Sequence, residues 1–211
     1  MDTRHSTKNI WKAGYVSALT AFIAIAGFST AQILQVIGIL YFPFDAILIY
    51  GFSLCIAVPF MVALLALHYI TPSESRFWSH AALLFAVIYV TYVTLNYAVQ
   101  LTVVLPFDQR NTVLDQTPHS LFWTIDALGY IFMGFATLFA VPLFAKQGPE
   151  KRIRYFFLAN GLMNPVIAFV YFYPVFSTPV LLFGMPWIIT APGSILFLTL
   201  YFKNGERNVR E

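Results

Sequence analysis

The sequence predicts an all-α integral membrane protein, built as one bundle of six transmembrane helices over residues 1–211. Hydrophobic residues make up 59% of the chain and charged residues only 10%, whereas a soluble domain carries about 25% charged residues. The apolar residues also gather into six runs, each long enough for the roughly 20 residues that a helix needs to cross a bilayer. The composition therefore excludes an ordinary water-soluble enzyme and a disordered chain.

The limits of the six spans follow from the apolar runs and from local signals at their ends. Thr-Pro pairs at 117–118 and 178–179 are typical of a helix start. The pair Asn204-Gly205 is typical of a helix end. The expected spans are residues 13–37, 45–69, 77–104, 118–145, 152–175 and 179–203.

The N-terminal run has a competing interpretation as a cleavable signal peptide. Basic residues precede the run, and the segment Ala24-Ile25-Ala26 has the small residues of a cleavage site. However, the apolar run continues to about Leu40, which suits a membrane span better. We therefore expect the run to be retained as the first span.

Lysines and arginines predict the orientation of the bundle. With six spans, one side of the membrane holds both termini and the connections 70–76 and 146–154. Because basic residues accumulate on the cytoplasmic side, we expect cytoplasmic termini and a location in the cell membrane. Eleven of the twelve basic residues lie on this side and Arg110 lies on the other. The eleven are Arg4, Lys8, Lys12, Arg76, Lys146, Lys151, Arg152, Arg154, Lys203, Arg207 and Arg210.

Asp126 is the only acidic residue expected well inside a span. An ionised aspartate at the middle of a span costs roughly 2.5–3.5 kcal/mol on insertion scales, and no lysine or arginine is expected at its depth. The side chain is therefore either protonated or exposed to a water-filled cavity. It is a ligand-binding, proton-carrying or acid–base group, or else it only holds helices together through hydrogen bonds.

Other polar and aromatic residues are expected in the same outer layer of the bundle. Gln32 and Gln35 of the first span lie at a related depth. Residues of the third span share one helical face, and residues around Asp126 share a face of the fourth span. Amide side chains commonly bond across helices, so the alternative for these residues is helix packing alone. The candidate ligand-binding residues are Asp126, Asn96, Gln100, Trp123, Tyr130 and Tyr92.

Asn160 and Asn164 form a second polar patch, four residues apart on one face of the fifth span. They are expected near the centre and the cytoplasmic half of the membrane. Pro165 cannot donate a backbone hydrogen bond to Gly161, and the two amides could fill that polar gap. We expect them to connect helices, with a functional role as the alternative.

The sequence predicts no metal site and no cofactor. Its single cysteine, Cys55, excludes an internal disulfide and a multi-cysteine site. His68 and His80 are expected near the cytoplasmic interface and His119 near the outer one, where solvation accounts for them. No zinc-protease, serine-hydrolase or phosphate-loop motif is present.

Three classes of function remain open. The first is a transporter, sensor or receptor-like protein that binds a small apolar or cationic ligand, or a lipid, in an outer-leaflet pocket near Asp126. The second is an intramembrane enzyme that acts on a lipid or isoprenoid with Asp126 as general acid. The third is a structural or assembly subunit. Membrane lipids are expected partners in every case and homo-oligomers stay open, whereas a net charge of +3 is too small for a nucleic-acid partner.

Overall fold

The computed structural model describes residues 3–210, with side chains described for residues 7–207. This part of the chain is helical and contains no β-strand. The predicted all-α class is thereby confirmed for the described residues, and six of their helical segments are long and apolar enough to cross a membrane, the number of spans that the sequence predicts. The helices are α1 (Thr3–Val36), α2 (Phe44–Ile70), α3 (Arg76–Val99), α4 (Leu121–Ala140), α5 (Glu150–Leu162), α6 (Asn164–Phe172), α7 (Thr178–Leu182) and α8 (Trp187–Arg210). Short 3₁₀ turns cover Ser73–Ser75 and Val141–Leu143, and a π-helical turn covers Gln100–Val104.

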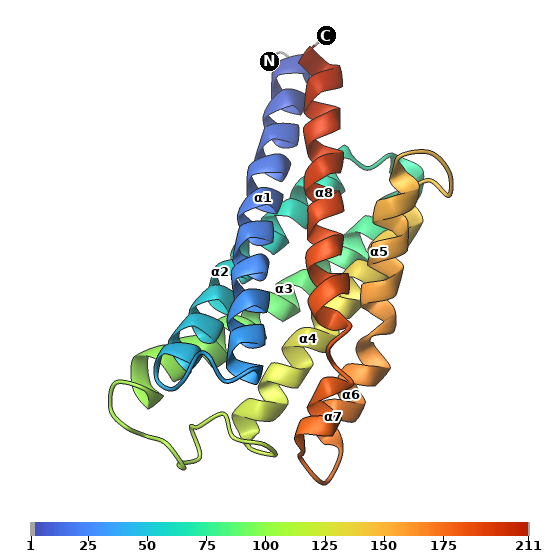
Figure 1. Ribbon diagram of the computed structural model, residues 1–211. Coiled ribbons are helices and arrows are strands. Elements are labelled where there is room, and N and C mark those ends of the chain that lie inside the picture. Colours follow the sequence, from blue (N-terminus) through green and yellow to red (C-terminus); the bar gives the residue numbers. More distant parts are fainter. Residues whose placement is uncertain (1–2, 211) are drawn as a thin grey trace.

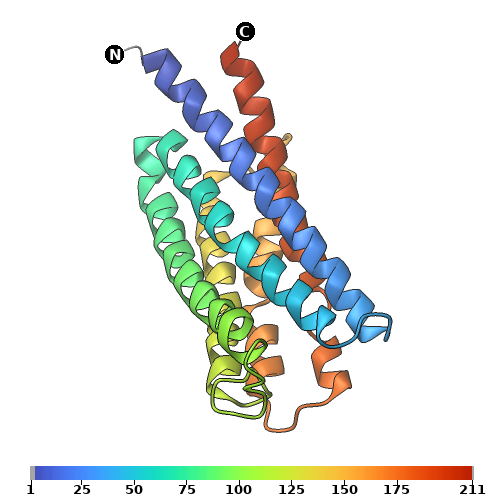
Figure 2. The same cartoon turned by 90° about the vertical axis from the view of Figure 1, so that its left-hand side faces the viewer.

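Helix α1 begins and helix α8 ends at the same end of the bundle, as an even number of spans requires (Figure 1). We call this the terminal end. The first and last long helices, α1 and α8, run side by side from there, and α1 also packs along α2 (Figure 2). Helix α4 lies against α3, α5 and α6. The connections 37–43, 105–120 and 173–177 lie at the opposite end, which we call the distal end.

Three helix ends differ from the expected ones. Helix α1 begins at Thr3, before the expected start of the first membrane span at residue 13. Helix α4 begins at Leu121 rather than at 118, because the Ser120 side chain accepts the Trp123 backbone N–H at 3.1 Å and caps it there. Helix α8 continues past Gly205 to Arg210. The side chains of Arg4 and Arg210, used in the orientation argument, lie outside the described ones.

Gly205 shows why the expected helix end was wrong. A Cβ at this position would collide with the ring of Trp11 in α1. The glycine therefore serves the close approach of α8 to α1, and its permissive backbone is not used to end the helix.

The fifth and sixth expected spans are each broken into two helices. The break between α5 and α6 falls at Met163, two residues before Pro165, whose missing N–H cannot continue the helical ladder. The break between α7 and α8 covers residues 183–186 and contains Gly184 and Pro186. A break in a membrane-spanning helix is tolerated where its backbone is buried in protein or lines a cavity. Residues of the α7–α8 break line a cavity that is described below.

Candidate functional site

Asp126 lies in the interior of α4, 3% exposed, and accepts four hydrogen bonds. Oδ1 accepts the Tyr97 hydroxyl at 2.6 Å and the Asn96 amide at 3.4 Å. Oδ2 accepts the Tyr171 hydroxyl at 2.7 Å and the Gln116 amide at 2.9 Å. We call these four donors the Asp126 shell. They come from α3, from α6 and from the connection before α4, so one carboxyl group joins three parts of the bundle.

The Asp126 shell contains no cation. Among the described residues, no lysine, arginine or histidine bonds to the Asp126 carboxyl group. An ionised carboxylate offers about four acceptor positions, and the four donors match that number. A tyrosine hydroxyl can also accept a hydrogen bond, so the shell accommodates a protonated Asp126 as well. The shell can therefore stabilise an ionised Asp126 without a partner cation, and it also allows the Asp126 carboxyl group to take up and release a proton.

Gln100 positions the loop that covers Asp126. It begins the π-helical turn that ends α3, a local feature that is frequent at functional sites. Its amide donates to the Leu114 backbone oxygen at 2.7 Å, and its carbonyl accepts the Gln116 N–H at 3.3 Å. These two bonds hold the loop against α3, and the Gln116 side chain consequently reaches Asp126.

Asp126 lines a cavity of about 400 Å³ near the distal end, which we call the acidic cavity. Two further carboxylates, those of Asp45 and Asp115, line it as well. The one basic side chain among its described lining residues is Arg110, which is exposed and bonds to Asp108 at 2.5 Å. The charge of the cavity wall is therefore dominated by carboxylates.

Aromatic rings form much of the remaining wall of the acidic cavity. The rings of Trp123 and Tyr171 lie 4.5 Å apart between centroids, and those of Tyr50 and Tyr97 lie 5.4 Å apart. The Tyr130 hydroxyl is 3.4 Å from the Tyr97 hydroxyl. The faces of such rings attract cations, most strongly when water is excluded. The carboxylates and the ring faces of the wall thus both favour a cationic ligand.

Polar residues of α1 complete the wall on the side of α2. The Gln35 amide donates to Asp45 Oδ2 at 2.8 Å, and Gln32 donates to Gln35 at 2.7 Å. All three residues line the acidic cavity. Gln32 and Gln35, expected at a depth related to that of Asp126, thus line the same cavity as Asp126.

The structure brings five of the six candidate ligand-binding residues together. Asn96 bonds to Asp126 from behind the cavity, whereas the other four line the wall: Asp126, Gln100, Trp123 and Tyr130. Tyr92 does not join them. Its ring instead packs on Phe132, 5.5 Å away between centroids. The inward face of α3 passes through Val93 and Tyr97, which are buried, and Tyr92 lies beside that face.

Sequence reasoning missed Tyr97, Tyr171 and Gln116 as partners of Asp126. Tyr97 neighbours Asn96 and Gln100 on the α3 surface, a signal that was available. Tyr171 lies seven residues after Asn164, two turns along the same helical face. The sequence does not indicate the position of Gln116, because it lies in a loop and a loop has no periodicity that predicts where its side chains point.

The second polar patch lies apart from the acidic cavity and connects helices. The Asn160 amide donates to Thr137 Oγ1 of α4 at 3.1 Å and accepts Thr190 Oγ1 of α8 at 3.5 Å. The Asn164 amide donates to the Ile131 backbone oxygen at 3.1 Å. These bonds hold α5 and α6 on their neighbours.

The terminal end carries one pair of facing histidines. The rings of His68 and His80 lie 5.5 Å apart between centroids, and His68 Nδ1 is 2.9 Å from the Ser79 hydroxyl. Within the described part of the chain, no group of three or more potential metal ligands forms.

Comparisons of this chain with protein-family models, with curated proteins and with solved structures find no match. Its function is accordingly inferred from the geometry and chemistry of the acidic cavity.

Proposed function

We propose that the protein is an integral membrane protein of one six-helix domain, with both termini in the cytoplasm and the acidic cavity in the outer half of the membrane. The six apolar helical segments support insertion. The strong excess of basic residues at the terminal end supports the orientation. In this orientation the distal end faces outward, and the acidic cavity receives its ligand from outside the cell or from the outer leaflet.

The acidic cavity binds a small organic cation, such as a quaternary ammonium or a protonated amine. One observation carries this proposal: the carboxylates of Asp45, Asp115 and Asp126 line a single cavity together with tyrosine and tryptophan rings. Arg110 does not balance them, because its guanidinium bonds to Asp108 and lies over the ring of Phe42, 4.8 Å from the centroid. An anion would meet repulsion there, whereas a cation gains both Coulomb attraction and ring contacts.

A pair of isosteric probes tests this function. Choline and 3,3-dimethylbutan-1-ol have nearly the same shape, but only choline is charged. Titration calorimetry on the protein in nanodiscs should show choline binding at least about tenfold more tightly, a difference of about 1.4 kcal/mol. Equal affinity for the two probes would refute a cation site.

Two variants test whether the preference for choline depends on Asp126. Asp126→Asn should clearly lower the preference for choline, because the amide keeps the volume and removes one of the three carboxylate charges. Glu74→Gln makes the same change at an exposed residue of the terminal end and should leave the preference unchanged. Loss of the preference in both variants would show a nonspecific effect of charge.

The burial of Asp126 without a partner cation favours a second candidate, an enzyme that uses Asp126 as general acid toward a lipid or isoprenoid. The Tyr97 and Tyr171 hydroxyls lie 2.6 and 2.7 Å from the carboxyl oxygens and would hold the carboxylate once its proton has been transferred. Incubation with extracted membrane lipids, followed by mass spectrometry, should then show a product that Asp126→Asn does not form. A structural subunit without a ligand would give neither cation binding nor a product.

A further inference from the structure

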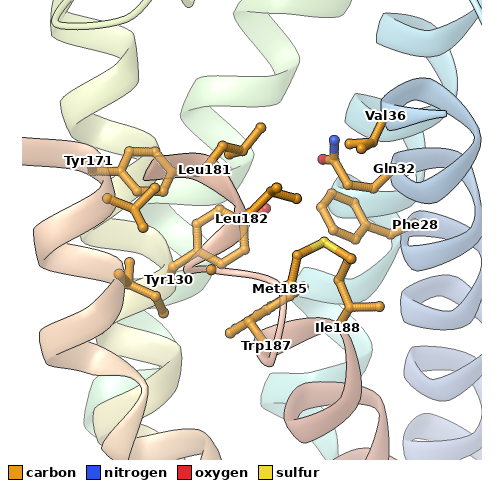
Figure 3. A pocket seen from close by; sticks show the side chains of 13 residues that line it. Phe28, Gln32, Val36, Tyr130, Tyr171, Leu181, Leu182, Met185, Trp187 and Ile188 are labelled. Carbon is orange, nitrogen blue, oxygen red and sulfur yellow. The ribbon is translucent and has the colours of Figure 1, made fainter. Parts of the chain in front are cut away.

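We propose that the ligand is amphipathic, with its cationic head in the acidic cavity and a short apolar group in a second cavity beside it. This inference rests on the proposed cation binding and adds the class of ligand. The second cavity has a volume of about 90 Å³ and lies between α1, α4, α6 and the α7–α8 break. We call it the apolar slot. Figure 3 shows its side chains, among them Phe28, Leu182, Met185 and Trp187.

The apolar slot and the acidic cavity meet along a shared wall. Gln32, Tyr130 and Tyr171 line both cavities, as do Phe28 and Leu181. No charged side chain lines the slot among the described residues. A ligand held by its cation near Asp126 therefore has an uncharged, mostly hydrocarbon space next to it, and its apolar part can be buried without facing a carboxylate.

The apolar slot opens toward the lipid side of the bundle. Three apolar residues of its wall, Val36, Leu182 and Met185, are 39%, 45% and 38% exposed. The backbone beside it is the break between α7 and α8, where turns such as Gly184 N–H to Leu181 oxygen at 2.9 Å replace the regular helical ladder. Irregular backbone at membrane depth is expected where it lines a cavity. Apolar parts of a ligand can thus reach the slot from the bilayer.

The size of the apolar slot limits the apolar group. A dry cavity of about 150 Å³ binds benzene, so the smaller slot suits an alkyl chain of about four carbon atoms or fewer. Each methylene that moves from water into an apolar site should strengthen binding about fourfold. The expected ligand is therefore an amine or quaternary ammonium with one short apolar substituent.

A chain-length series of alkyltrimethylammonium ions tests the inference. Titration calorimetry on the protein in nanodiscs, with empty nanodiscs as the blank, would compare tetramethyl-, ethyltrimethyl-, butyltrimethyl- and hexyltrimethylammonium. We expect the butyl compound to bind about sixtyfold more tightly than the tetramethyl compound, which lacks three of its methylenes. The hexyl compound should gain little more, because its last methylenes extend past the slot toward the lipid, where transfer into the bilayer is already accounted for by the empty nanodiscs.

Filling the slot should remove this dependence. Leu182→Trp places a larger side chain in the slot at a partly exposed position, and we expect the butyl-to-tetramethyl affinity ratio to fall close to one. Leu162→Trp makes the same change at an exposed residue of α5 that lines none of the cavities described here, and it should keep the ratio. Leu182→Ala enlarges the slot and should move the best chain length from butyl to hexyl, which also provides a test if the tryptophan variant does not fold.

The outcomes separate the two proposals. If tetramethylammonium shows no binding that depends on Asp126, the proposed function is wrong. If tetramethylammonium binds in that way but affinity does not rise with chain length, or rises equally in Leu182→Trp, the cation site stands and the apolar slot is not part of it.

Discussion

The Tyr171 hydroxyl donates a 2.7 Å hydrogen bond to Asp126 Oδ2 and so ties α6 to α4. A second bond acts in parallel, because Trp123 Nε1 donates to the Tyr171 backbone oxygen at 2.9 Å. The side chain and the backbone of Tyr171 are therefore both held by α4. Helix α6 thus supplies a donor to the Asp126 shell, and the two bonds in turn fix the end of α6 against α4.

Tyr171→Phe should lower stability and leave the ring packing in place. The variant removes one hydrogen bond to a buried carboxyl group, a loss of about 1.5–3 kcal/mol if Asp126 is charged. Thermal unfolding in detergent measures the change. Tyr173→Phe is the control, because its exposed hydroxyl makes no hydrogen bond within the described residues. An equal loss in both variants would contradict a specific role for the Asp126 bond.

Two substitutions at Asp126 separate the contribution of its hydrogen bonds to stability from that of its charge. Asp126→Asn can still accept and donate hydrogen bonds within the shell, so we expect unfolding close to that of the original protein. Asp126→Leu removes the acceptor of the buried Tyr97 hydroxyl and of the half-buried Tyr171 and Gln116 donors, and each buried group left unpaired costs about 1–3 kcal/mol. We therefore expect a large loss of stability or a failure to fold. A stable Asp126→Leu protein would mean that the shell does not hold α3, α4 and α6 together.

Gly134 makes room for Asn164. A Cβ at Gly134 would collide with the Asn164 amide, which would have to give up its 3.1 Å bond to the Ile131 oxygen. Gly134→Ala should therefore destabilise the protein by about 1–3 kcal/mol. In an Asn164→Ala background the same change should cost much less. Gly51→Ala is the control, since nothing lies within 4 Å of its added Cβ, and it should be neutral or slightly stabilising.

Charges at the rim of the acidic cavity should change cation affinity in opposite directions. The guanidinium of Arg110 holds the pKa of the Asp108 carboxyl below its usual value, so this pair stays ionised near neutral pH. Arg110→Gln leaves the Asp108 carboxylate without its partner, so the rim becomes more negative and binding of choline should strengthen severalfold, whereas Asp115→Asn should weaken it. Both effects should shrink at high salt, because screening is strong for exposed charges. Calorimetry at two salt concentrations would show this, and effects of the same sign would count against the electrostatic argument.

Thiol labelling tests the orientation. In a Cys55→Ser background, which removes the only cysteine, Val113→Cys lies in the distal loop and Gln147→Cys lies in the connection before α5; both positions are exposed. A membrane-impermeant maleimide added to intact cells should label position 113. Position 147 should react only after the cells are opened. The reverse pattern would place the termini outside.

The sequence by itself determined the all-helical class, the six apolar segments and the layer of polar residues around Asp126. These features depend on hydropathy and on helical periodicity, which are properties of local sequence. The depth of Asn96, Gln100 and Asp126 followed from their positions along their spans, and depth alone was enough to expect them near one another.

Only the tertiary structure decided which side chains complete the site. The rotation of α3 placed Tyr97 rather than Tyr92 in the interior. Both tyrosines lie next to the face of Asn96 and Gln100, so helical periodicity alone does not choose between them. The breaks at Met163 and at residues 183–186 set the positions of Tyr171 and of the apolar slot. Gln116 and Asp115 reach the cavity because Gln100 holds their loop. A loop conformation depends on such long-range bonds, and no pattern within the loop itself encodes them.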